Sequence, residues 1–412
     1  MDLSHARSGL SAERLERITA HLNRAYVEPG KIAGCQVAVS RHGHLAYFRS
    51  LGLMDVERAK PMADDAIFRI YSMTKPITSV ALMTLFEQGW FQLDDPVSRY
   101  VPEWRDQKVW ISGDGDQMEL VVPDKPLSFR HVLSHTGGLT YGSLLAALGM
   151  PDDGHPVTKA YAKAEVRRGD GETLHDFAMK LAKTPLRYQP GERWMYSLST
   201  DVCGYLVERI SGKRFDDYLR EVIFEPLGMV DTSFVVPPEK IDRFTANYSR
   251  LPNKTLRLTD DPQSSTYLKQ PTFLSGGGGL TSTTADYLRF AEMLRRGGEL
   301  DGARILGPRT IDMMRQNHLP GGKDLTELAI GGFTETAYNG VGFGLGFAMT
   351  LDEVKTGVLG QQYYYWVGAA STIFWVDPKE DLCVVFMVQL MPSGMFNFRD
   401  QLKNIVYSAI TD

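Results

Sequence analysis

Extended segments are predicted at both ends of the chain, with helical patterns between them. The extended segments are residues 34–40 and 44–49, separated by the turn Arg41-His42-Gly43, and residues 363–366, 372–376 and 382–390. The middle of the chain, from about residue 90 to residue 263, is rich in helical periodicity. One antiparallel sheet built from both chain ends, with a mainly helical region inserted, is the arrangement that this order favours. The sequence therefore predicts an α+β fold with two lobes.

We expect residues 1–80 and 265–412 to form the lobe with the sheet and its flanking helices, and residues 81–264 to form the mainly helical lobe. The predicted helices are one capped by Ser11, one over the apolar run 77–86, and those at 284–296 and about 397–409. Residues 149–171 are punctuated by Gly and Pro and are expected to be irregular, either a binding loop or a plain surface excursion.

Composition narrows the possible partners. The chain has 412 residues, of which 43% are apolar, so it can bury one large core or two smaller ones. A net charge of −5 provides no field that favours nucleic acid. The apolar run 382–390 is much shorter than the roughly 20 residues that span a bilayer, and no signal peptide is evident. We therefore expect a cytoplasmic protein with no membrane segment and with Cys35, Cys203 and Cys383 as core thiols, while the oligomeric state stays open.

The pattern Ser72-Met73-Thr74-Lys75 begins the apolar helix predicted at 77–86. Residues at i and i+3 share a helix face, so Ser72 and Lys75 are expected to project together. An amine beside a serine can accept its proton, and a helix N-terminus offers N–H groups to a developing oxyanion. Pro76 fits only near a helix start. Such a pattern also occurs by chance about once in a chain of this size, and the alternative is an ordinary capped helix with a solvated lysine.

Ser72-Met73-Thr74-Lys75-Pro76 resembles the first motif of the serine β-lactamase and penicillin-binding-protein superfamily, specifically of the class C β-lactamase-like esterases called family VIII carboxylesterases. Gly191-Glu192-Arg193-Trp194-Met195-Tyr196-Ser197 resembles the second motif of that family. The resemblance implies that Tyr196 lies within hydrogen-bond reach of Ser72 and acts as general base, with Lys75 lowering the pKa of its phenol. Without the resemblance, Tyr196 is one of 18 tyrosines and packs a helix cap.

Two segments compete for the third motif of the family. Lys355-Thr356-Gly357 matches the Lys-Thr-Gly of β-lactamases, but it lies between Asp352-Glu353 and a glycine-containing loop. Trp366-Val367-Gly368-Ala369 is in the expected position and resembles the Trp-Gly-Gly variant of the esterases, from which it departs at Val367. The resemblance implies an oxyanion hole formed by the backbone N–H groups of Ser72 and Ala369. It also places Trp366, Val367 and Gly368 among the substrate-binding residues.

Further segments support the resemblance. Leu133-Ser134-His135-Thr136-Gly137-Gly138-Leu139 and residues 275–282, which include four consecutive glycines, look like family landmarks, and we expect His135 to be structural. The glycine run has no following Gly-Lys-Ser/Thr of a phosphate loop, no His-x-x-x-His or His-Glu-x-x-His of a zinc hydrolase is present, and no Gly-x-Ser-x-Gly occurs.

The resemblance implies a β-lactamase-like fold and a serine carboxylesterase that forms an acyl-enzyme on Ser72 with small-molecule esters, without a metal or organic cofactor. Trp366 stands where β-lactamases hold a lysine, and Leu198 stands where many relatives hold an asparagine, so uncharged short-chain esters are favoured. The aromatic run 363–366, with Tyr365, either lines an acyl pocket or is a buried strand. The alternatives are weak cephalosporin hydrolysis, a β-lactamase or D-alanyl peptidase, an acyltransferase, and a non-catalytic binding protein of the same fold.

Overall fold

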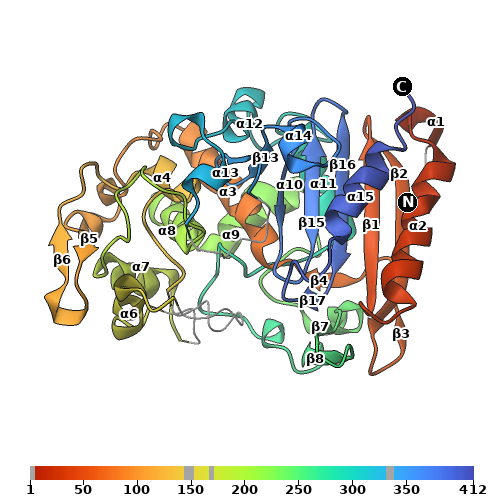
Figure 1. Ribbon diagram of the computed structural model, residues 1–412, viewed down its shortest axis with the longest axis horizontal. Helices are drawn as coiled ribbons and strands as arrows, with labels where there is room; N and C mark the ends of the chain where they lie inside the picture. The colour runs from red at the N-terminus through yellow and green to blue at the C-terminus, as the bar shows by residue number, and fades with distance from the viewer. Residues whose placement is uncertain (1–4, 143–152, 167–170, 331–337) are drawn as a thin grey trace.

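A main sheet of eight strands joins the two ends of the chain in the computed structural model, which describes residues 5–142, 153–166, 171–330 and 338–412 (Figure 1). The strand order is β12-β13-β14-β15-β16-β1-β2-β3, and neighbouring strands run antiparallel. Their bounds are β1 Gly34–Arg41, β2 His44–Asp55, β3 Lys60–Pro61, β12 Val341–Phe343, β13 Ala348–Thr350, β14 Tyr364–Val367, β15 Ile373–Asp377 and β16 Leu382–Val388. β1 lies between β2 and β16, which confirms the predicted antiparallel sheet closed by both chain ends.

The hairpin between β1 and β2 follows from local backbone preferences. His42 and Gly43 both have positive φ, at 54° and 75°, which matches the twist of a two-residue hairpin turn. Every residue of β1 is buried, and so is every residue of β16. Strands that are buried on both faces need helices on both sides of the sheet.

Two layers of helices supply that cover. On one face, α2 (Ala12–Leu22) bonds to the sheet through Thr19 Oγ1 and Tyr47 Oη, and α15 (Phe398–Tyr407) packs Phe398 on Phe386 of β16. On the other face, the Tyr287 ring of α11 (Thr284–Arg295) packs on Phe374 of β15. The predicted helices near both chain ends are confirmed, and α2 begins at the predicted cap, where Ser11 Oγ accepts from Arg14 N.

The helices between residues 74 and 227 lie at the end of the molecule away from β1 and β2 (Figure 1). α3 (Thr74–Glu87), which confirms the helix predicted around 77–86, packs against α8 (Ser199–Ser211). The others are α4 Phe129–Leu133, α6 Pro156–Lys163, α7 Leu174–Ala182, α9 Phe215–Leu219 and α10 Glu225–Leu227, together with the hairpin β5 Val109–Ser112 and β6 Glu119–Val121. The prediction of an irregular stretch at 149–171 is wrong for residues 156–163, which form α6. His155 caps this helix and Pro156 is its first residue. Residues 149–152 and 167–170 lie outside the described residues.

Short strands connect the two regions. β4 (Ile67–Arg69) pairs with β9 (Thr281–Thr283), and β7 (Asn247–Arg250) pairs with β8 (Leu256–Asp260) and with β17 (Leu390–Met391). Outside these lie α1 His5–Ser8, α12 Pro308–Met314, α13 Leu325–Leu328, α14 Glu353–Thr356, and the pair β10 Glu299–Leu300 and β11 Ala303–Arg304. α3 crosses residue 80, where the predicted lobe boundary falls, and the exact division into lobes stays a prediction.

The three cysteines are buried and unpaired, which confirms that they are core thiols. No helix within the described ranges is long and apolar enough to cross a membrane.

Candidate active site

Ser72 lies where β4 passes into α3. A single 3₁₀ turn, Tyr71–Met73, joins the two elements, and Ser72 is buried within it. Tyr71 has φ 42°, a left-handed conformation that is uncommon for a bulky residue and costs free energy unless the surroundings hold it. Here Asn247 Nδ2 donates to Tyr71 Oη at 3.1 Å. The residue before Ser72 is therefore held in place by a strand that is far away in the sequence.

Lys75 occupies the first turn of α3, one turn after Ser72. Its side chain is only 1% exposed, and Nζ donates to Ser72 Oγ at 3.2 Å and to the carbonyl oxygen of Gly277 at 2.6 Å. The N-terminus of α3 has no side-chain cap. The alternative of a capped helix with a solvated lysine therefore does not describe this turn.

The glycine run holds the partner of Lys75, and Asp201 of α8 holds that loop. Asp201 Oδ1 accepts from Ser275 Oγ at 2.6 Å and from Gly277 N at 3.0 Å. A Cβ at Gly277 would lie 2.8 Å from Asp201 Oδ2, so the close approach requires glycine. Asp201 is fully buried, and sequence reasoning missed it, although an acid within an otherwise apolar helix was the available signal.

Aromatic rings surround the ammonium group of Lys75. Nζ lies 4.6 Å from the ring centroid of Tyr196 and 5.8 Å from that of Tyr141. A cation within about 6 Å of a ring face is attracted by the ring quadrupole. The Tyr141 and Tyr196 centroids are 5.3 Å apart, and Trp366 Nε1 donates to Tyr196 Oη at 3.3 Å. Tyr141 is a further member of the site that sequence reasoning did not single out.

His135 packs beneath Tyr196 and is held between two helix-start hydroxyls. Its Nδ1 lies 3.1 Å from Ser197 Oγ, its Nε2 lies 3.4 Å from Thr200 Oγ1, and its ring centroid is 5.1 Å from that of Tyr196. Burial, and secondly the charge of Lys75, hold the pKa of His135 well below its usual range. The imidazole is therefore neutral near pH 7 and supports the position of Tyr196.

Strand β14 separates the predicted substrate-binding residues into two groups. Trp366 points to the same side as Tyr196, with ring centroids 5.3 Å apart. Tyr365 points to the opposite face, where its ring meets Lys403 of α15, and Val367 lines a cavity on that same face. Successive side chains of a strand alternate between faces, so the structure does not bring the side chains of Tyr365 and Val367 to Ser72. The grouping of these residues with Trp366 overlooked that alternation.

The turn that follows β14 comes back against the segment before Ser72. A Cβ at Gly368 would lie 2.6 Å from the carbonyl oxygen of Ile70, and Gly368 N donates to Thr372 O. Ala369 follows directly, and within the described ranges its N–H donates no hydrogen bond.

Leu198 is fully buried just before α8, where its N–H donates to Thr140 O.

Lys355 lies elsewhere. It belongs to the short helix α14, its side chain is 56% exposed, and its Nζ is 3.7 Å from Asp324 Oδ2. It contributes nothing to the cluster around Ser72. Among the described residues, no group of three or more His, Cys, Asp or Glu side chains is arranged to hold a metal ion.

The chain is similar to known proteins along most of its length. The family model described as Beta-lactamase matches residues 19–407. Protein Rv1367c of Mycobacterium tuberculosis (strain ATCC 25618 / H37Rv) is 32% identical over 373 residues, which cover 90% of this chain and 88% of that protein. Esterase EstB of Burkholderia gladioli is 32% identical over 305 residues, 69% of this chain and 71% of that protein. The solved structure of EstCE1, a hydrolase with promiscuous acyltransferase activity, is 26% identical with a TM-score of 0.78 and covers 97% of this chain and 99% of its own.

Proposed function

Because the chain belongs to the β-lactamase family and is a serine hydrolase, we propose that it is a carboxylesterase that acts on uncharged short-chain esters through an acyl-enzyme on Ser72. The observation that supports this most directly is the buried contact between Lys75 Nζ and Ser72 Oγ, with the Tyr196 ring beside the ammonium group. A nucleophile beside an amine and a phenol is the arrangement that acyl transfer needs.

The reaction divides into two halves. In acylation, Ser72 Oγ attacks the ester carbonyl carbon, its proton passes to the pair formed by Lys75 and Tyr196, and the pair returns a proton to the departing alkoxide. In deacylation, water attacks the acyl-enzyme, the pair accepts a proton from it, and Ser72 leaves with that proton. We assign the proton to the pair as a whole and not to either residue.

An oxyanion hole formed by the backbone N–H groups of Ser72 and Ala369 would stabilise the tetrahedral intermediate. The close approach of Gly368 to Ile70 supports it, because that contact places the Gly368–Ala369 turn against the segment that carries Ser72. Val367 departs from the glycine of related esterases, but its side chain points away from the turn, toward α15.

The proposed preference for uncharged esters rests on Trp366. The indole is fully buried beside Tyr196, at the position where related β-lactamases have a lysine that binds a carboxylate. An apolar wall there offers no charge-assisted hydrogen bond to an anionic substrate. Lys355, the other lysine that matches the third motif, is on exposed α14. Weak cephalosporin hydrolysis is a lesser activity of the same acyl-enzyme.

Acyl transfer to an alcohol acceptor is the second candidate. EstCE1, with which this chain shares its fold over nearly its whole length, is a hydrolase with promiscuous acyltransferase activity. The same acyl-enzyme would serve both outcomes, because an alcohol can replace water in the second half-reaction.

The test compares Ser72→Ala with Ser128→Ala, a serine that caps helix α4 instead. Ser72→Ala is expected to lower kcat/KM for p-nitrophenyl acetate and butyrate by at least about 10⁴-fold with circular dichroism unchanged, because it removes the nucleophile. Ser128→Ala is expected to stay within about twofold. Retained activity in Ser72→Ala contradicts the proposal.

Two further measurements define the substrate. A serine-directed fluorophosphonate label, located by mass spectrometry, is expected on Ser72 alone. An acyl-chain-length series with nitrocefin alongside is expected to favour the short esters over the β-lactam; preferred hydrolysis of nitrocefin would instead identify a β-lactamase.

A further inference from the structure

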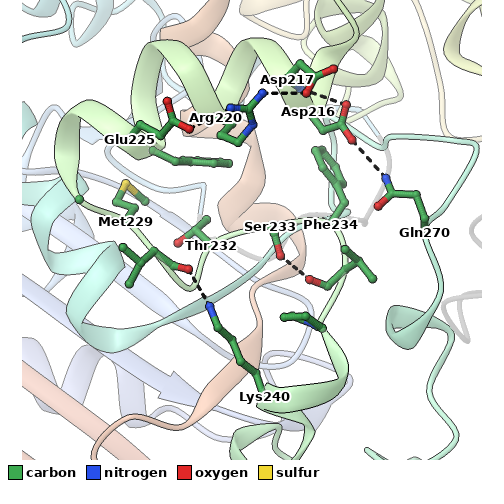
Figure 2. Close-up of a pocket in the computed structure, with 15 residues that line it drawn as sticks. Asp216, Asp217, Arg220, Glu225, Met229, Thr232, Ser233, Phe234, Lys240 and Gln270 are labelled. Carbon is green, nitrogen blue, oxygen red and sulfur yellow. Dashed lines mark hydrogen bonds and ion pairs between the residues drawn. The ribbon is translucent and has the colours of Figure 1, made fainter.

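One cavity of the protein lies apart from the residues around Ser72. It measures about 600 Å³ and is formed by α9, the turn before α10 and the segment 228–240 (Figure 2). Neither Ser72 nor Lys75 nor Tyr196 lines it. Its size lies within the range of small-molecule pockets, about 300–1,000 Å³.

The floor of this cavity is apolar. Phe224, Met229 and Phe234 are buried there, and Val235 adds a further aliphatic side chain. Val230, at the rim, is 75% exposed. Water over such a floor is released when an apolar molecule takes its place, which favours binding.

The charged residues of the cavity already have partners. Arg220 donates to Asp217 at 3.0 Å and to Glu225 at 2.8 Å. Lys240 donates to the carbonyl oxygen of Val230 at 2.9 Å (Figure 2) and lies 2.8 Å from Asp231, which is outside the lining. The Arg220 pairs are half-exposed, so a charged ligand would exchange one surface contact for another and gain little net electrostatic energy. The apolar floor favours an uncharged ligand without any such exchange.

The hydroxyl groups of the cavity, those of Thr232 and Ser233, also have hydrogen-bond partners within the protein. Thr232 Oγ1 donates to Asp286 at 2.9 Å, and Ser233 Oγ donates to the carbonyl of Val235. The cavity therefore offers an apolar surface with few polar groups ready for a ligand, which suits an aromatic or branched aliphatic compound.

One ring joins this cavity to the active site. Phe234 lines the cavity, and a Cβ at Gly279 would lie 2.8 Å from the Phe234 ring. Ser233 also pairs through its backbone with Thr281, at 3.2 and 2.8 Å. Gly279 is the last glycine of the run whose Gly277 carbonyl accepts from Lys75, and Thr281 follows two residues later. An occupant that rests on Phe234 supports the loop that holds Lys75.

We propose that this cavity is an accessory site for an uncharged aromatic small molecule, whose binding stabilises Phe234 and the glycine run behind it. The binding claim is independent of the proposed esterase function; only the effect on turnover rests on it.

The binding test uses 2-naphthol, which is uncharged at pH 7, with calorimetry on the Ser72→Ala protein. Saturable binding is expected, and 2-naphthoate, the matched carboxylate, is expected to bind at least tenfold more weakly. Val235→Trp fills the cavity and is expected to weaken 2-naphthol binding at least tenfold. Val354→Trp, at a side chain 88% exposed on α14, is the control and is expected to leave it unchanged.

The results that overturn the proposal are absence of saturable binding, equal binding of 2-naphthoate, or unchanged binding in Val235→Trp. Should Val235→Trp lose its native circular dichroism, Val230→Asp at the exposed rim replaces it, with an expected loss of at least threefold.

The link to the active site has its own readout. In the wild-type protein, which retains Ser72, saturating 2-naphthol is expected to change kcat for p-nitrophenyl acetate at saturating ester. Val235→Trp is expected to abolish this response. Purely competitive inhibition that persists in Val235→Trp would place the probe at Ser72 and overturn the proposal. Failure of the esterase function alone would leave calorimetric binding intact.

Discussion

Helices α3 and α4 begin with the same spacing, a serine followed three residues later by a basic side chain, and use it in opposite ways. At α4, Ser128 Oγ accepts from His131 N, and His131 Nδ1 accepts from Ser128 N, which forms a reciprocal capping box. At α3, the Ser72 hydroxyl caps nothing and instead meets the Lys75 ammonium. Chemistry at a helix start thus depends on which partners surround the basic group, and the spacing alone does not determine it.

The largest expected difference in activity is between alanine variants of two lysines, Lys75 and Lys355, each of which lies in the first turn of its helix. Lys75→Ala is expected to lower kcat/KM for p-nitrophenyl acetate by at least about 10³-fold, because the proton-accepting pair loses one member. Lys355→Ala is expected to remain within about twofold, since its side chain is exposed and pairs only with Asp324 among the described contacts. Equal losses in both variants would contradict the distinction.

The second prediction concerns Tyr196, whose ring lies beside the Lys75 ammonium at the start of α3. Tyr196→Phe keeps the ring beside Lys75 and removes only the hydroxyl that accepts from Trp366. A fall in kcat of about 10²- to 10³-fold is expected, as for loss of a general acid–base group. Tyr141→Phe is the matched control on the neighbouring ring and is expected to lose about tenfold or less. Reversed sizes would transfer the proton-handling role to Tyr141.

The third prediction concerns Asp201, which contacts the glycine run at Gly277. Asp201→Asn is expected to lower kcat about tenfold with little change in KM, because the Gly277 carbonyl that accepts from Lys75 loses its firm support. Ser275→Ala removes one of the donors to the same carboxylate and is expected to change kcat in the same direction but less. Full activity in both variants would show that the loop holds Lys75 without Asp201.

The smallest effect concerns stability at α4. Burial lowers the pKa of His131 to about 4, against an ordinary value near 6.5. Between these values the unfolded chain binds a proton that the folded chain does not, so this contribution is present above pH 6.5 and is lost as pH falls toward 4.

His131→Gln keeps the capping box, because glutamine suits that position, and removes the titration. The free energy of unfolding of the wild type, measured by urea titration, is expected to fall by up to about 2 kcal/mol more than that of the variant between pH 7 and pH 5. Parallel pH dependences would refute the assignment to His131, and esterase activity is expected to stay within about twofold.

The fold could be predicted from the sequence to a large extent, because its signals are local. The turn Arg41-His42-Gly43, the cap at Ser11 and the apolar run after Lys75 each specify an element without reference to distant residues. The helix at 156–163 was missed because Gly and Pro on either side of a short amphipathic segment suggest an irregular stretch.

The site was less predictable, because its contacts join distant parts of the chain. Ser72 and Lys75 are neighbours along one helix, so their contact followed from spacing. The support of Gly277 by Asp201 spans 76 residues, and no local pattern indicates it. Tyr365 was placed with Trp366 because the two are adjacent in sequence, whereas a strand sends adjacent side chains to opposite faces.

The position of β1 between β2 and β16 has a consequence for biosynthesis. A ribosome finishes β1 more than 300 residues before it finishes β16, since their registers pair Cys35 with Val388 and Arg41 with Leu382. Throughout that interval one edge of β1 has unpaired backbone groups and an apolar surface, which is the kind of strand edge that invites aggregation. Contacts of such long sequence separation also fold slowly. Production of this protein in a cell should therefore benefit from slow synthesis and abundant chaperones, and translation that stops before residue 382 should yield insoluble chains.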